Sequence, residues 1–157
     1  VADVQDLPVL GEFDVAVAGY LLHYAPDRAT LLRMCRSIAA QLPAGGRFIT
    51  INENPEQPAD RYRGYQQYGF SKSVDRTRRE GSQITYTMIA GREVFRFHVT
   101  HFERQTYEWA LLAAGFSDIR WHPVRLDPAG VAAQGEDYWR EYLGNPPIVG
   151  LDCRRAD

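Results

Sequence analysis

The sequence shows no excess of positive charge. Lysine and arginine together number 18 and aspartate and glutamate 20, which gives a formal net charge of −2 over 157 residues. Proteins that bind nucleic-acid phosphates normally carry a clustered basic excess. The composition therefore gives no reason to expect a nucleic-acid partner, and we expect the ligand to be a small molecule.

Long apolar runs and paired cysteines are missing as well. The apolar stretches are too short to cross a bilayer, and no secretory signal pattern opens the chain, so we expect a cytoplasmic protein with no membrane partner. Cys35 and Cys153 lie far apart in sequence and match neither a disulfide framework nor a zinc spacing. We therefore expect two reduced structural thiols and no metal site.

The sequence also lacks a G-x-G-x-x-G motif, which would hold the phosphates of a dinucleotide. Its first residue is Val1, and both methionines, Met34 and Met88, are internal. From these features we expect that a segment precedes Val1. Without that segment, an unpaired apolar strand edge would favour self-association.

What is present begins with a strand, a helix and a second strand. Residues 13–19 (FDVAVAG) form a nearly continuous apolar run, which predicts a strand covered on both faces. Pro26 and Asp27 then predict a helix start, and apolar residues recur at helical spacing as far as Pro43. Residues 47–52 (RFITIN) predict the next strand, parallel to the first.

The rest of the chain predicts one further helix–strand region after a polar insertion. Residues 53–82 are rich in tyrosine and arginine and lack a clean period, and we read residues 53–105 as a substrate-side insertion within a single domain, 1–157. The other expected elements are a hairpin over 84–102 that turns at 90–92, a helix from the cap Thr106 to Gly115, a strand at 116–124, a helix at 136–143 and a strand at 148–153.

Four short motifs in this order resemble the C-terminal part of class I S-adenosylmethionine-dependent methyltransferases, especially small-molecule enzymes of the toxoflavin type. The motifs are DVQDLP followed by FDVAVAGYLLHYA, then LPAGGRFIT, TYEWALLAAGF and the terminal PPIVGLDCRR. The resemblance implies an α/β fold, the second half (strands 4 to 7) of a Rossmann-like methyltransferase sheet with its last strand antiparallel and with an inserted hairpin. It also implies S-adenosylmethionine as the cofactor.

The resemblance further implies which residues meet the cofactor. Ligands of open α/β sheets bind beyond the carboxyl ends of the strands. At the first such edge the carboxylate of Asp3 would accept from the adenine amino group, and the backbone N–H of Val4 would donate to the ring. Ala18, Gly19 and Tyr20 end the next strand, where small residues let the backbone approach a ligand. Alternatively, Asp3 caps nearby amides, and Gly19 serves only close helix packing.

Polar and aromatic residues beyond that edge are the candidates for the acceptor molecule. His23 has a pKa suited to a general base, although a structural histidine fits the sequence equally well. Tyr24 follows it, and an aromatic cluster in the insertion would wall a pocket for a planar or hydrophobic acceptor, or would pack the insertion onto the sheet. His98 and His101 lie on opposite faces by strand alternation, so at most one of them faces a pocket. The candidate substrate residues are Tyr24, Tyr62, Tyr65, Tyr68, Phe70 and His101.

We therefore expect methyl transfer to a nitrogen, oxygen or carbon atom of a small molecule, performed by the complete parent protein. Two alternatives stay open. One is a non-catalytic ligand-binding or subunit-interaction module derived from the same fold. The other is a different Rossmann-like enzyme, such as a nicotinamide-dependent one, which an upstream G-x-G-x-x-G would favour.

Overall fold

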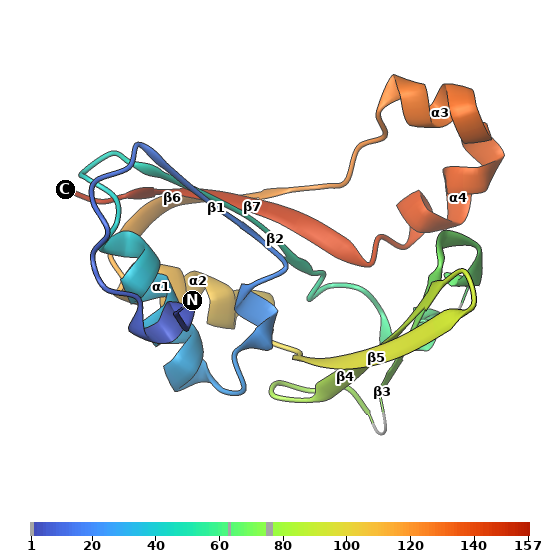
Figure 1. The fold of residues 1–157 in the computed structure, drawn as a ribbon, viewed down its shortest axis with the longest axis horizontal. Coiled ribbons are helices and arrows are strands. Elements are labelled where there is room, and N and C mark those ends of the chain that lie inside the picture. The colour runs from blue at the N-terminus through green and yellow to red at the C-terminus, as the bar shows by residue number, and fades with distance from the viewer. Residues whose placement is uncertain (1, 63, 75–76) are drawn as a thin grey trace.

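The computed structural model describes residues 2–62, 64–74 and 77–157. In this part of the chain two sheets lie at an angle to each other, and helices cover one face of the larger sheet (Figure 1). The strands are β1 (Val15–Gly19), β2 (Arg47–Glu53), β3 (Phe70–Val74), β4 (Gln83–Ala90), β5 (Glu93–Thr100), β6 (Phe116–His122) and β7 (Ile148–Arg155). The α-helices are α1 (Arg28–Ala39), α2 (Arg104–Ala113), α3 (Pro128–Gln134) and α4 (Glu136–Gly144), with short 3₁₀ turns η1 (Val4–Asp6), η2 (Leu22–Tyr24), η3 (Ala59–Arg61) and η4 (Gln66–Tyr68).

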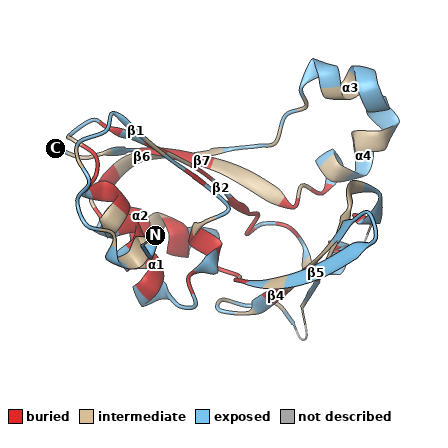
Figure 2. Cartoon of the chain, viewed as in Figure 1, coloured by how far each residue is buried: buried red, intermediate tan, exposed pale blue. Residues whose placement is uncertain are grey.

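The larger sheet has the strand order β1-β2-β7-β6. Strands β1 and β2 are parallel, and β7 runs antiparallel to both β2 and β6. This is the predicted sheet, with its last strand antiparallel. Helices α1 and α2 pack on one face and enclose the main core, which includes the fully buried Leu31, Phe48 and Leu111 (Figure 2).

Local signals place α1 and α2 correctly, with one exception. The Asp27 carboxylate accepts from the Thr30 N–H at 2.7 Å and begins α1, as predicted. Gly115, at φ 85°, follows the end of α2 in the left-handed conformation, also as predicted. Thr106, however, is not the cap of α2. The N-cap is Glu103, and the Thr106 hydroxyl donates instead to the Glu80 carboxylate at 2.8 Å.

The described residues cover only one face of strand β1. Ala16 and Ala18 face the core, whereas Val15 and Val17 on the opposite face are exposed, Val17 by 74%. The expectation of a strand covered on both faces is therefore not met within this chain. Among the described strands, β2 alone pairs with β1, so the other edge of β1 is open.

Residues 53–105, which we continue to call the insertion, contain a three-stranded antiparallel sheet, β3-β4-β5, rather than the predicted two-stranded hairpin. It has its own small core around Ile84 and Val99, and it lies beyond the carboxyl ends of β1 and β2 (Figure 1). Strand β3 and helix α3 were not predicted from the sequence, and β6 ends at His122 rather than at residue 124. Cys35 and Cys153 are free and fully buried, as predicted. No helix in the described ranges has the length and apolar character needed to cross a bilayer.

Candidate functional site

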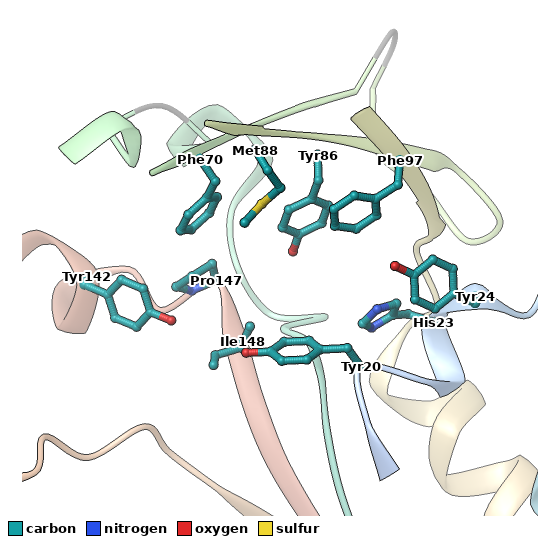
Figure 3. Close-up of a pocket in the computed structure, with 10 residues that line it drawn as sticks. All are labelled: Tyr20, His23, Tyr24, Phe70, Tyr86, Met88, Phe97, Tyr142, Pro147 and Ile148. Atoms are coloured by element: carbon teal, nitrogen blue, oxygen red, sulfur yellow. The ribbon is translucent and has the colours of Figure 1, made fainter. Parts of the chain in front are cut away.

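A cavity of about 320 Å³ opens where the carboxyl end of β1 faces the insertion (Figure 3). We call it the aromatic pocket. Its lining comes from the turn after β1, from all three strands of the insertion, from α4 and from the start of β7: Tyr20, His23, Tyr24, Phe70, Tyr86, Met88, Phe97, Tyr142, Pro147 and Ile148. Its volume is at the lower end of the range for small-molecule sites, about 300–1,000 Å³.

Strand register explains the wall that the insertion contributes. Tyr86 lies opposite Phe97, and Met88 lies opposite Phe70, so these four side chains share one face of the small sheet. The rings of Tyr86 and Phe97 are stacked, with centroids 5.2 Å apart and planes 5° from parallel. The pocket therefore has a flat aromatic wall.

Tyr20 forms another wall of the aromatic pocket, and its backbone is in an unfavourable conformation. Its φ of 56° is in the left-handed region, which is unfavourable for a tyrosine, and its N–H donates to the Ile51 carbonyl at 2.9 Å. This turn ends β1 and directs the chain into η2. It also places the half-exposed Tyr20 ring on the pocket lining, as Figure 3 shows.

The Tyr20→Gly variant of the protein is expected to be more stable than the Tyr20→Ala variant. Both Tyr20→Gly and Tyr20→Ala remove the same ring, but only glycine adopts the left-handed conformation freely, so the difference in unfolding free energy should be about 1 kcal/mol. Urea denaturation of the two variants measures it. Equal stability, or a more stable alanine variant, would contradict the left-handed turn at this position.

His23 is buried in the turn η2, with 3% of its surface exposed. Its Nδ1 accepts a hydrogen bond from the Glu53 backbone N–H at 3.1 Å, and its ring lies between Tyr20 and Tyr24. Burial lowers the pKa of His23 to about 4, with Glu53 opposing the shift and Lys72 adding to it. The imidazole is therefore neutral at physiological pH.

This lowered pKa predicts a pH-dependent loss of stability. The unfolded state binds a proton at His23 below its ordinary pKa of 6.5, whereas the folded state does so only near 4, so protonation favours unfolding as the pH falls between these values. The shift corresponds to up to about 3 kcal/mol. The variant His23→Asn keeps an acceptor, Oδ1, for the Glu53 N–H and leaves the neighbouring residues unchanged. In this variant the pH-dependent loss of stability that comes from His23 should vanish. If the unfolding free energies of the wild type and of His23→Asn fall in parallel from pH 7 to pH 4, the pKa of His23 is not lowered.

Behind the pocket, a buried ion pair joins the larger sheet to the insertion. Glu53 ends β2 and Lys72 lies in β3, and both side chains are fully buried, with Nζ 2.9 Å from Oε1. The Tyr62 hydroxyl donates to the same oxygen at 3.2 Å, and Gln57 accepts from Nζ. His101 Nδ1 lies 3.6 Å from Glu53 Oε2. Burial raises the pKa of Glu53, but Lys72 and His101 outweigh that effect and hold it below its ordinary value, so the carboxylate is charged.

Two of the six predicted substrate residues, Tyr24 and Phe70, line the aromatic pocket. The other four do not. Tyr62 and His101 belong to the buried cluster around Glu53, and the Tyr65 and Tyr68 hydroxyls bond the Asn145 and Tyr138 carbonyls of the α4 region. For Tyr62, Tyr65 and Tyr68 the structure thus supports the alternative interpretation, in which they pack the insertion. Of the two hairpin histidines, His98 is exposed and His101 buried, and neither lines the pocket.

Six lining residues were not predicted from the sequence. Tyr86, Met88 and Phe97 had a usable signal, because alternation along a hairpin places them on one face. No comparable signal in the sequence marks the other three, Tyr142, Pro147 and Ile148. They line the pocket because of the course that the chain takes from β6 through α4 to the start of β7 (Figure 1).

The predicted cofactor residues lie along β1 and η1. The Asp3 carboxylate accepts from the backbone and side-chain nitrogens of Gln5, each at 3.0 Å, and these bonds lower the pKa of Asp3. Asp3 therefore caps the nearby Gln5 amide, as the alternative interpretation predicted, and its exposed side chain is also accessible to a ligand. Val4 and Ala18 line a second hollow, of about 240 Å³, along β1.

Gly19 has open space beside it. A Cβ atom added at this position would meet no atom within 4 Å, so close helix packing does not explain the glycine. Along the chain, Gly19 follows Ala18, which lines the hollow along β1, and precedes Tyr20, which lines the aromatic pocket. The space beside Gly19 is suited to a ligand that approaches the backbone there.

No family model and no curated protein matches the sequence. Solved structures do match the fold. A methyltransferase dependent on S-adenosylmethionine from Mesorhizobium loti aligns with a TM-score of 0.62 and 22% identity over 98% of this chain and 68% of its own. The CcbJ methyltransferase from Streptomyces caelestis gives 0.63 and 12%, over 100% and 63%. CalS10, an amino pentose methyltransferase from Micromonospora echinaspora with S-adenosylmethionine bound, gives 0.55 and 16%, over 99% and 63%.

The chain therefore has the fold of part of a Rossmann-like methyltransferase domain, as the motifs predicted. It spans about two thirds of the length of these structures. Identities of 12% to 22% establish the shared fold, and the chemistry has to be argued from this chain's own residues.

Proposed function

We propose that the protein transfers a methyl group from S-adenosylmethionine to a small molecule held in the aromatic pocket. The observation that carries this proposal is that consecutive residues at the end of β1 meet both spaces: Ala18 lines the hollow along β1, the space beside Gly19 is open, and Tyr20 lines the aromatic pocket. Cofactor and acceptor would then meet at the carboxyl end of β1, where open α/β sheets bind their ligands.

The residues on the cofactor side fit an adenosine-containing ligand. Asp3 is an exposed carboxylate that can accept from an amino group, and the Val4 N–H makes no hydrogen bond to another described residue. Ala18 and Gly19 present backbone without bulky side chains. When bound, S-adenosylmethionine would supply an electrophilic methyl carbon: the acceptor atom would bond to it as the carbon–sulfur bond breaks, sulfur would keep the electron pair, and any proton on the acceptor atom would be lost to solvent after the product leaves the pocket.

The residues on the acceptor side exclude water and orient a flat molecule. Aromatic side chains make up most of the pocket lining, and no acidic or basic side chain other than His23 is among the described lining residues. In-line transfer depends mainly on alignment and on exclusion of water, and a rigid apolar pocket contributes to both. Tyr24 and Phe70 are the predicted substrate residues that we retain on this side, and Tyr20, which was predicted to meet the cofactor, also lines this pocket.

Calorimetric titration of the natural full-length protein with S-adenosylhomocysteine tests the cofactor part of this proposal. We expect saturable binding with a stoichiometry of one per chain. If no heat is detected at millimolar ligand, the methyltransferase proposal is wrong, and the non-catalytic alternative takes its place.

The open face and edge of β1 favour association as well. Val15 and Val17 are exposed, and among the described strands only β2 pairs with β1, an arrangement prone to pairing with another segment. We expect residues 1–157 expressed alone to run as dimers or larger species in analytical ultracentrifugation, and Val17→Lys to shift them toward monomer. A monomer with a sharp cooperative melt would argue against this interface.

A further inference from the structure

The hydrogen bond at His23 follows from how β1 ends. In a parallel pair, a strand's N–H groups bond the neighbouring strand's carbonyls. The left-handed turn at Tyr20 leads the chain away after Gly19, so the Glu53 N–H lacks the carbonyl that a longer β1 would have offered. His23 Nδ1 takes that place, at 3.1 Å.

This contact fixes the ring orientation and the tautomer. A ring turned by 180° would place a carbon against the Glu53 N–H, which would leave a buried donor unsatisfied. A proton on Nδ1 would set two N–H groups against each other at the same distance. The neutral ring therefore carries its proton on Nε2. Glu53 is held in turn by Lys72 and Tyr62 through its side chain.

The proton on Nε2 is available to a ligand. The His23 ring borders the aromatic pocket between Tyr20 and Tyr24, as Figure 3 shows, and its Nε2 makes no hydrogen bond to a described residue. Among the described lining residues, the other polar side-chain groups are the hydroxyls of Tyr20, Tyr24, Tyr86 and Tyr142. The pocket thus combines flat apolar walls with one fixed N–H donor.

We propose that His23 is a hydrogen-bond donor that selects the acceptor molecule, and that this molecule is an uncharged aromatic compound with an in-plane lone pair, on a ring nitrogen or a carbonyl oxygen. This inference rests on the proposed function of the aromatic pocket. It replaces the general-base role predicted from the sequence, because a base needs the Nε2 lone pair, which the Glu53 contact denies. His23 is then a specificity-determining residue.

Nitrogen NMR of the imidazole in the full-length protein tests the tautomer without any ligand. We expect the coupling pattern of an Nε2–H ring, unchanged from pH 8 to pH 5.5. A proton on Nδ1, or a ring that becomes fully protonated above pH 6, would overturn the inference.

Two matched probes test the donor. Isoquinoline offers a ring nitrogen and naphthalene does not, although the two have nearly the same shape. In His23→Asn, which keeps an acceptor for Glu53 and loses the Nε2 donor, isoquinoline should bind about fivefold more weakly, the value of one neutral hydrogen bond, whereas naphthalene affinity should not change. His23→Gln, whose amide nitrogen can approach the position of Nε2, should retain most of the isoquinoline affinity.

Equal weakening of both probes would mean that His23 only packs, and no binding of either probe to the wild type would remove the pocket as an acceptor site. Either result contradicts the inference and leaves S-adenosylhomocysteine binding untouched. Conversely, if the two probes differ as expected but the protein binds no S-adenosylhomocysteine, the role of His23 as a donor would stand and the proposed methyltransferase function would be wrong. Thermal melts of each variant confirm that it is folded.

Discussion

Gly19→Leu is expected to abolish S-adenosylhomocysteine binding with almost no change in stability. The leucine side chain would fill the open space beside β1 that we assign to the cofactor, since no atom lies within 4 Å of an added Cβ. The affinity should fall by well over tenfold, that is by more than about 1.4 kcal/mol, whereas the unfolding free energy should stay within about 0.5 kcal/mol. Calorimetry and thermal melts of the full-length protein measure the two effects.

Gly144→Leu is the matched control for this substitution. Gly144 ends α4, an added Cβ there also meets no atom within 4 Å, and it belongs neither to the aromatic pocket nor to the hollow along β1. This variant should bind S-adenosylhomocysteine as the wild type does. Normal binding by Gly19→Leu would place the cofactor elsewhere.

Glu53→Ala should destabilise the protein by about 3–5 kcal/mol, because it leaves the fully buried Lys72 ammonium without its carboxylate. Lys72→Met should destabilise the protein to a similar extent, because it leaves the buried Glu53 carboxylate without its ammonium partner. The double variant Glu53→Gln/Lys72→Met removes both charges and should recover most of the loss. Chemical denaturation of the full-length proteins gives the three values.

The exposed Arg140–Asp137 pair provides the comparison for this ion pair. Both of its side chains are more than three-quarters exposed, so Arg140→Ala should change stability by less than about 1 kcal/mol. If Glu53→Ala is equally mild, the Glu53–Lys72 pair does not hold the insertion to the larger sheet.

Elements with a local signal were predictable from the sequence. Strand β1, helix α1 and strand β2 follow from apolar periodicity and from the Asp27 cap. Helix α3 also had a signal that was overlooked, because Asp127 precedes Pro128 and accepts from the Ala129 N–H at 2.8 Å.

Strand β3 could not be predicted in the same way. Its most buried side chain is Lys72, a residue that normally marks an exposed position, and its burial depends on Glu53, nineteen positions earlier in the chain. A long-range ion pair of this kind leaves no periodic pattern.

The candidate site was predictable only in part for a related reason. Tyr20, His23, Tyr24 and Phe70 were singled out and line the pocket, since they follow β1 or begin a strand of the insertion. Tyr65 lies close in sequence to Phe70 yet points toward Asn145. The hydroxyls of Tyr65 and Tyr68 are held by residues in and directly after α4, and no sequence spacing records such long-range contacts.

The most direct test of the central claim is the response of individual backbone amides to S-adenosylhomocysteine. Amide NMR of the isotope-labelled full-length protein should show the largest shift changes at Val4, Gly19 and Tyr20, at the carboxyl end of β1, and small changes at Gly144 and along α3. Binding that shifts α3 and α4 but leaves Val4 and Gly19 unchanged would contradict a cofactor site at the end of β1.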